Sequence, residues 1–196
     1  MTETEEKILI EKILSGEREA FREIMEQYSS SVISVAYRMA GSLINAREIA
    51  QDVFVQVYRS LHKYDPALSF SSWLYRITVN KAIDHIRSMK RHIFESLDYS
   101  SNSSFKELEH KKGSLTDDRI VQQEFRSILN SILVKLTVNQ RAVYVLRDLQ
   151  ECSTGEIARI MQCSRATVRV HLSNARRTIK EILIKDYPEY NAKERV

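Results

Sequence analysis

Residues 156–177 have the sequence EIARIMQCSRATVRVHLSNARR, in which two helical patterns are separated by a short break. Apolar residues recur at helical spacing over 157–161, and the pattern stops at Gln162 and Cys163. Ser164 can then accept a backbone N–H at the start of a longer helix. A short helix, a brief turn and a longer helix form the layout of a helix-turn-helix, whose second helix enters the major groove of DNA.

The longer helix has two different faces. At about 100° per residue, one stripe is apolar and is expected to pack inward: Val168, Leu172, Ala175, Ile179 and Ile182. The opposite side combines small or apolar residues with bases: Ala166, Val170, Ser173 and Arg177, flanked by Arg169, Arg176 and Lys180. This mixture suits a DNA groove, where methyl groups meet thymine and arginines reach guanine edges or phosphates. A basic helix packed against a linker or a partner is the alternative.

Composition and charge place this motif in a cytoplasmic protein with one ordinary domain or two small ones. The chain has 196 residues, of which 43% are hydrophobic, and its net charge is +4. Residues 1–30 hold 8 acids against 4 bases, whereas residues 157–180 hold 6 lysines and arginines and no acid. No apolar run approaches the roughly 20 residues that span a bilayer, and the acidic start is unlike a signal peptide. The basic end indicates a nucleic-acid surface.

Helical periodicity extends over nearly the whole chain and predicts an all-α fold. The expected helices cover residues 4–14, 17–28, 30–40, 45–63, 70–90, 117–136, 138–148, 154–161 and 165–184. Capping boxes at 137–140 and 153–156 mark two of the starts. Residues 92–116 are rich in serine and charge, so we expect a flexible linker between two small helical domains, 1–91 and 117–187, with a tail at 188–196.

The expected helix 70–90 carries a second nucleic-acid pattern. Its far side presents a tryptophan followed by polar and basic groups: Trp73, Ile77, Asn80, Asp84 and Arg87, beside Arg76 and Lys81. An aromatic at the head of a basic face can stack on the bases of single-stranded DNA and hold its phosphates. The turn at 64–70, with Tyr64 and Phe70, could receive a flipped base. Alternatively, Trp73 belongs to the core and the polar groups form a local network.

The expected helix 45–63 carries a candidate docking face for another protein. Its inward stripe consists of Ala46, Ile49, Ala50, Val53, Val57 and Leu61. Glu48, Gln51 and Val55 project the other way, beside Asp52, Tyr58 and Arg59. An apolar residue centred among polar groups is typical of a small protein-docking patch.

Three of these stretches together resemble a known family. Residues 45–58, NAREIAQDVFVQVY, resemble the polymerase-core-binding helix of bacterial sigma factors, and residues 70–80, FSSWLYRITVN, resemble their promoter-melting and −10 recognition helix. The block from LTVNQR at 136–141 to ARR at 175–177 resembles their −35-reading domain. The order of the stretches, the serine-rich linker and the short chain resemble the extracytoplasmic-function (ECF) group of the sigma-70 family. One departure from the family pattern is Gln162, which stands where a glycine is common.

The resemblance implies two domains, one like sigma region 2 and one like the helix-turn-helix region 4. It implies contacts to core RNA polymerase by Glu48, Gln51, Asp52 and Val55. It implies −10 DNA contacts by Tyr64, Phe70, Trp73, Arg76, Asn80, Asp84 and Arg87. It implies −35 DNA contacts by Arg165, Ala166, Arg169, Val170, Ser173, Arg176 and Arg177. The implied partners are core RNA polymerase, promoter DNA and an anti-sigma factor, with no catalysis and no cofactor or metal.

Two other classes fit parts of the pattern. A stand-alone helix-turn-helix regulator, with an N-terminal half that senses a ligand or dimerises, would bind a palindromic duplex without polymerase. A nucleoid-coating protein would need more net charge than +4. Cys152, Cys163 and His171 lack the closely spaced pairs of a structural zinc site, and no phosphate loop, nucleophile elbow or HExxH motif occurs.

Overall fold

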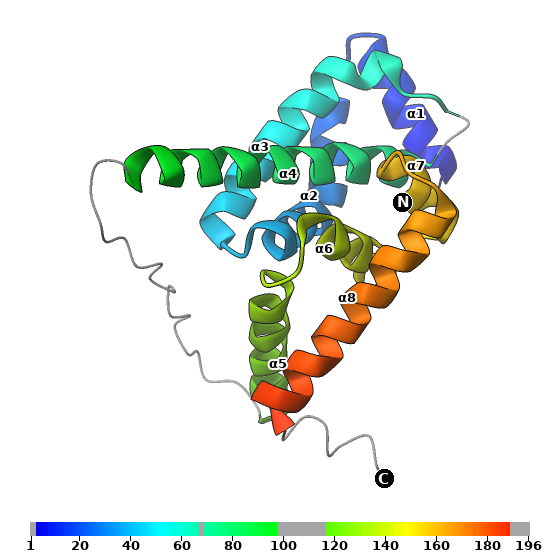
Figure 1. Ribbon diagram of the computed structural model, residues 1–196. Coiled ribbons are helices and arrows are strands. Elements are labelled where there is room, and N and C mark those ends of the chain that lie inside the picture. The colour runs from blue at the N-terminus through cyan, green and yellow to red at the C-terminus, as the bar shows by residue number, and fades with distance from the viewer. Residues whose placement is uncertain (1–2, 67–68, 98–116, 189–196) are drawn as a thin grey trace.

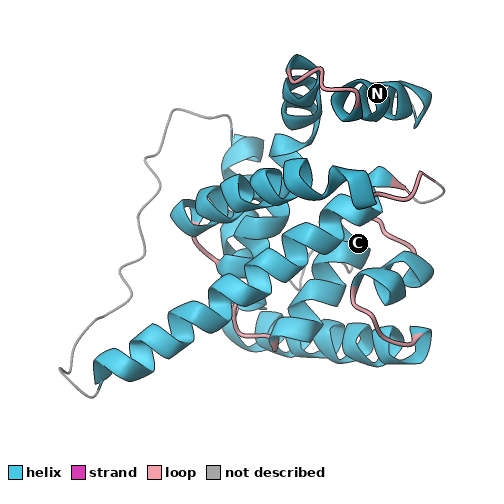
Figure 2. Ribbon diagram, turned by 90° about the horizontal axis from the view of Figure 1, so that it is seen from above, coloured by secondary structure: helices cyan, strands magenta, loops and turns pink. Residues whose placement is uncertain are grey.

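The computed structural model describes residues 3–66, 69–97 and 117–188, and the regular structure in these ranges is entirely helical (Figures 1 and 2). The first half contains α1 (Glu3–Leu14), α2 (Glu19–Ala40), α3 (Leu43–Ser60), the 3-10 turn η1 (Leu61–Lys63) and α4 (Phe70–Leu97). The second half contains α5 (Asp117–Leu133), α6 (Val138–Tyr144), the π-helical turn η2 (Val145–Leu149), α7 (Thr154–Ile160) and α8 (Arg165–Asp186). The all-α prediction is confirmed. No described helix has the length and apolar character needed to cross a bilayer.

The first half is built on three helices, α2, α3 and α4, each of which packs against the other two. The predicted inward stripe of α3 is buried in full, and Leu74, Val79 and Ala82 of α4 are buried as well. The acidic helix α1 packs on α2 and η1 and buries Leu9, Ile10 and Ile13. The predicted docking face on α3 and the predicted −10 face on α4 therefore belong to helices that share one core.

α2 is one continuous helix, whereas the sequence predicted two helices with a break near residue 29. Its buried stripe passes through the serine run at 29–31 without a change of phase: Ala20, Ile24, Val32, Val35, Ala36 and Met39. The Ser29 hydroxyl donates to the Met25 carbonyl one turn earlier, a bond that lets serine remain inside a helix. The helix ends at Gly41, whose φ of 76° is left-handed and whose N–H donates to the Tyr37 carbonyl at 2.7 Å.

Among the other helix boundaries, two differ most from prediction. α4 continues to Leu97, past the expected end at residue 90. The expected helix 138–148 changes at Val145 into the wider turn η2. Most of the expected linker (98–116) and most of the tail (189–196) lie outside the described residues.

The second half contains the predicted helix-turn-helix, formed by α7 and α8. Both capping boxes are confirmed, at Thr137 with Gln140 and at Ser153 with Glu156. The Ser164 hydroxyl accepts the Thr167 N–H at 3.0 Å, as expected for the start of the second helix. Gln162, in the turn, has a left-handed φ of 51°.

The two halves pack against each other through α2 and α4 on one side and α5, α6, η2 and α7 on the other. Arg141 of α6 is buried and donates to the Met39 carbonyl at the end of α2. Ser72 and Tyr75 of α4 donate to Glu156 at 2.9 Å and to Gln150 at 2.8 Å. These contacts place the helix-turn-helix beside the N-terminal end of α4, and Figure 1 shows α7 at that position.

Candidate nucleic-acid interface

The outer face of α8 is open along the predicted −35 surface. Its buried residues are Val168, Ala175 and Ile179, which confirms the centre of the predicted inward stripe. All seven predicted −35 residues are exposed: Arg165, Ala166, Arg169, Val170, Ser173, Arg176 and Arg177. Val170 is exposed by 58%, so its methyl groups are open on this face. The face thus has the form that a groove-binding helix requires.

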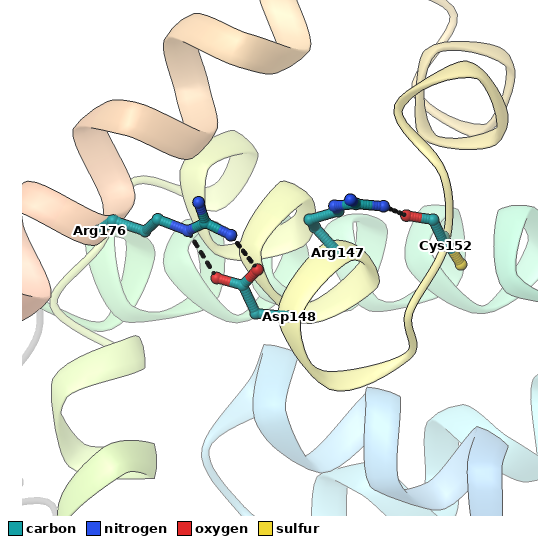
Figure 3. Close-up of polar contacts among 4 residues, drawn as sticks. All are labelled: Arg147, Asp148, Cys152 and Arg176. Carbon is teal, nitrogen blue, oxygen red and sulfur yellow. Dashed lines mark hydrogen bonds and ion pairs between the residues drawn. The ribbon is translucent and has the colours of Figure 1, made fainter.

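One arginine of this face is held in place. The Arg176 Nε and Nη2 atoms donate to the two Asp148 carboxylate oxygens at 2.9 Å and 2.5 Å (Figure 3). This hydrogen bond raises the pKa of Arg176 above its usual value. Arg147 lies next to Asp148 in the chain but points to the Cys152 carbonyl, 2.8 Å away, in Figure 3. The sequence did not single out Asp148, because its partner lies 28 positions away.

The predicted −10 face lies on the exposed side of α4. Arg76, Asn80, Asp84 and Arg87 are all exposed, and Arg87 lies 4.0 Å from Asp84 in a loose ion pair. A groove of about 320 Å³ separates Asn80, Asp84 and Arg87 from Asn139 and Met161 of the second half. Asn139 and Met161 were not among the predicted residues, since only the packing of the two halves brings them to α4.

An aromatic cluster stands at the N-terminal end of this face. The rings of Tyr64, Phe70 and Trp73 lie 5.4–5.7 Å apart, and Tyr28 of α2 adds a fourth ring 5.4 Å from Phe70. Phe70 is only 1% exposed, so it supports the other rings from below and presents no surface of its own to DNA. Trp73 is half-buried and packs against the core. Residues 67 and 68 of the predicted base-receiving turn lie outside the described residues.

The predicted docking face of α3 is exposed at every position: Glu48, Gln51, Asp52 and Val55. Val55 is exposed by 49%, and Tyr58, one turn further, by 45%. The Tyr58 ring packs edge-on against Phe21 of α2, with 5.1 Å between the ring centres. Tyr58 therefore extends the apolar part of the face.

The two cysteines of the described residues differ in burial. Cys152 is buried, and its burial raises the pKa of the thiol to about 11. Cys163 is half-buried. No group of three or more His, Cys, Asp or Glu residues in the described ranges is arranged to hold a metal ion.

Comparison with known proteins defines the class of this chain. Residues 24–92 match the model of sigma-70 region 2, and residues 126–179 match that of sigma-70 region 4. These two regions correspond to the two halves of the fold. The chain belongs to the sigma-70 family of RNA polymerase sigma factors, which are transcription initiation factors.

Within that family it is an ECF sigma factor. It is 28% identical over 176 residues to the ECF RNA polymerase sigma factor SigW of Bacillus subtilis, covering 89% of this chain and 94% of SigW. It is 28% identical over 181 residues to the ECF RNA polymerase sigma-E factor of Escherichia coli, covering 89% and 92% of the two chains. Promoter-specific initiation with RNA polymerase is the activity of this class.

Two solved structures share the fold. CnrH, solved in complex with the cytosolic domain of CnrY, superposes with a TM-score of 0.68 at 23% identity, over 93% of this chain and 99% of that chain. The sigma factor RpoE of Bartonella quintana, solved in complex with the anti-sigma factor NepR, gives a TM-score of 0.65 at 21% identity, over 83% and 96% of the two chains.

Proposed function

We propose that this chain directs core RNA polymerase to promoters by reading a −35 duplex with α8 and capturing a −10 strand on α4. The observation that supports the proposal is the presence on one chain of two exposed helix faces whose residue types suit DNA. One is an exposed basic helix of a helix-turn-helix, and the other is a polar helix face that begins at an aromatic cluster. A duplex reader alone would not need the second face.

In the −35 step, the N-terminal part of α8 reads the base sequence, and its later turns position the helix on the duplex by contacting phosphates. Arg165, Ala166 and Arg169 lie in the first turns, which in a helix-turn-helix contact base edges. Val170 offers an exposed methyl surface to thymine. Arg176 and Arg177, two turns further on, suit phosphates.

The −10 step uses α4 and the aromatic cluster. Tyr64 and Trp73 offer partly exposed rings for stacking, and Phe70 holds them from below. Arg76, Asn80, Asp84 and Arg87 extend along the helix in the direction a strand would follow. Capture of unpaired bases makes strand separation more favourable, so the chain needs no nucleotide hydrolysis and acts without being an enzyme.

The partner of the α3 face is core RNA polymerase. Glu48, Gln51 and Asp52 surround the exposed Val55, a small apolar centre with a polar rim. We propose that the protein works in the cytoplasm. We also propose that an anti-sigma factor controls it, as suggested by the fold it shares with the Bartonella quintana factor that was solved with NepR.

Run-off transcription tests the proposal. Purified chain, bacterial core polymerase and a pool of genomic fragments from the source organism are combined, and each protein is also tested alone. Specific transcripts that require both proteins, with −35 and −10 elements upstream of their start sites, are expected. A specific duplex bound by the chain alone, with no transcripts, would overturn the proposal in favour of a stand-alone regulator.

The docking face is tested by charge insertion. Val55→Glu is expected to weaken binding to core polymerase at least tenfold, because it places a charge at the apolar centre of the face. Ile8→Glu on α1 is the matched control, since Ile8 and Val55 are both exposed by 49%. Thermal unfolding verifies that both variants keep the fold. Equal affinity of Val55→Glu and wild type for core would remove this face from the proposal.

A further inference from the structure

Arg176 differs from the other arginines of the α8 face in how its side chain is held. Its Nε and Nη2 atoms donate in parallel to both oxygens of Asp148, at 2.9 Å and 2.5 Å. Arg177, its neighbour, has only a 4.0 Å ion pair with Glu181 and a 3.4 Å contact with Asn174. A parallel pair of short, charge-assisted bonds fixes the plane of the guanidinium, and a loose single contact does not.

The Asp148 carboxylate forms its hydrogen bonds with Arg176 of α8 and not with Arg147, its neighbour in the chain. The carboxylate belongs to η2, and its side chain is 20% exposed against 56% for that of Arg176. The partly buried Asp148 thus lies at the inner end of the pair, and Arg176 lies at its solvent-exposed end. Arg147, the adjacent base in the chain, is directed to the Cys152 carbonyl instead (Figure 3).

The bonds to Asp148 leave part of the guanidinium free. An arginine has five N–H donors, and the two donors in this pair lie on its Nε side. Three N–H donors remain, two on Nη1 and one on Nη2, and the bonds to Asp148 have already oriented them. An anion that meets these donors need not order the side chain first, which lowers the entropy cost of binding.

The position of Arg176 on α8 favours a phosphate as that anion. It stands on one stripe with Arg169 and Ser173, at helical spacing. It lies 11 positions after Arg165, roughly 16 Å along the helix axis from the end that enters the groove. Residues that far from the helix start meet the DNA backbone rather than base edges.

We propose that Asp148 is a positioning residue that holds Arg176 against a backbone phosphate of the −35 duplex. The proposal rests on the proposed function, because it takes α8 as the duplex-binding helix. It also accounts for an acid beside a DNA-binding face, where a bare carboxylate would repel phosphates. With Arg176 between them, the carboxylate and the phosphate share one cation.

A double-mutant cycle on the full chain tests the proposal. Wild type, Asp148→Ala, Arg176→Ala and the double variant are titrated by fluorescence anisotropy against two 30-base-pair duplexes of unrelated sequence, between 50 and 200 mM salt. Each single variant is expected to bind about three- to tenfold more weakly on both duplexes. The slope of log K against log salt is expected to fall by about 0.9, the value of one phosphate contact. The double variant is expected to be no weaker than Arg176→Ala.

Glu181→Ala is the matched control. It also removes one acid next to an arginine of the same face, but from a 4.0 Å pair whose side chains are both about 70% exposed. It raises the net charge by the same amount as Asp148→Ala, so its affinity is expected to equal or exceed that of wild type, with an unchanged salt slope. Asp148→Asn, which keeps the shape and one acceptor, serves if the alanine variant is unstable, and it is expected to fall between wild type and Asp148→Ala.

Three results would overturn the proposal. The first is an Asp148→Ala chain that binds duplex as tightly as Glu181→Ala, since Asp148 would then only compete with DNA for Arg176. The second is additive losses in the double variant, and the third is a loss confined to one of the two duplexes, which would indicate base readout. Each of these results would leave the polymerase-dependent transcription of the wild-type chain as expected. Failure of the role given to Asp148 is therefore distinguishable from failure of the proposed function.

Discussion

Arg141 of the helix-turn-helix half donates a hydrogen bond to the carbonyl of Met39, at the end of α2 in the region 2 half. The same guanidinium reaches the carbonyls of Val134 at 2.5 Å and Leu136 at 3.3 Å. Met39 is in the last turn of its helix, where carbonyls lack intrahelical partners. The buried Arg141 side chain therefore supplies a hydrogen-bond donor to the last turn of α2, 102 positions earlier in the sequence. This bond joins the two halves of the molecule.

Arg141→Met is expected to destabilise the fold by about 2–4 kcal/mol, because it leaves buried carbonyls without donors. Burial lowers the pKa of Arg141 to about 10, so the wild-type side chain is still charged at pH 7. Urea unfolding at pH 7 measures the loss. Arg159→Met, at an exposed position of α7, is the control and should change the free energy of unfolding by less than about 0.5 kcal/mol. Equal midpoints for both variants would contradict the role given to Arg141.

Gly41→Ala is expected to cost about 2–3 kcal/mol for two reasons. Its φ of 76° is strained for alanine, and the added Cβ would lie 2.6 Å from Val134 Cγ1 of the other half. Gly16→Ala separates the two causes, since Gly16 has a φ of 104° but no atom within 4 Å of its Cβ position. That control should lose only about 1 kcal/mol in thermal unfolding. Val134→Ala in the Gly41→Ala chain should recover part of the difference, and no recovery would indicate that the two residues do not touch.

Gln162→Gly is expected to stabilise the chain by about 0.5–1 kcal/mol. Gln162 holds a left-handed φ of 51° in the turn of the helix-turn-helix, where glycine carries no steric penalty. Differential scanning calorimetry should show a higher melting temperature. Arg159→Gly, within helix α7, should show the opposite shift, and a destabilised Gln162→Gly chain would mean that the glutamine side chain contributes more than the backbone strain removes.

The two thiols should react with iodoacetamide at very different rates at pH 8. Burial raises the pKa of Cys152 to about 11, so only about 0.1% of this thiol is ionised at pH 8 and little of it meets the reagent. Cys163 is half-buried and should be labelled first, as peptide mass spectrometry will show. In urea the two rates should converge. Faster labelling of Cys152 in the folded chain would contradict its burial.

The raised pKa of Cys152 also gives a sign for stability against pH. Its folded pKa of about 11 lies above the usual value of 9.0, so the folded state holds the proton more tightly. The resulting stabilisation is complete below pH 9 and declines as the pH rises from 9 towards 11. Cys152→Ser should flatten this part of the profile in urea unfolding between pH 8 and 10.5.

Local sequence was sufficient for most of the helices and for three of their starts. The capping boxes at Thr137 and Ser153 and the cap at Ser164 involve residues three positions apart, so their geometry follows from spacing alone. The buried stripes of α3 and α8 were predictable for the same reason, since helical periodicity sorts residues by face. The predicted break in α2 near residue 29 was wrong, because the buried stripe of the helix continues through the serine run at 29–31.

The chain's sequence by itself determined an all-helical protein, the order of its two functional halves and which helix faces remain polar, because these depend on residues a few positions apart. Only the tertiary structure decided that Phe70 lies beneath the aromatic cluster, that Arg141 closes the end of α2 and that Asp148 pairs with Arg176. Each of these depends on how helices distant in sequence pack, and burial and hydrogen bonding across such distances are set by the fold as a whole.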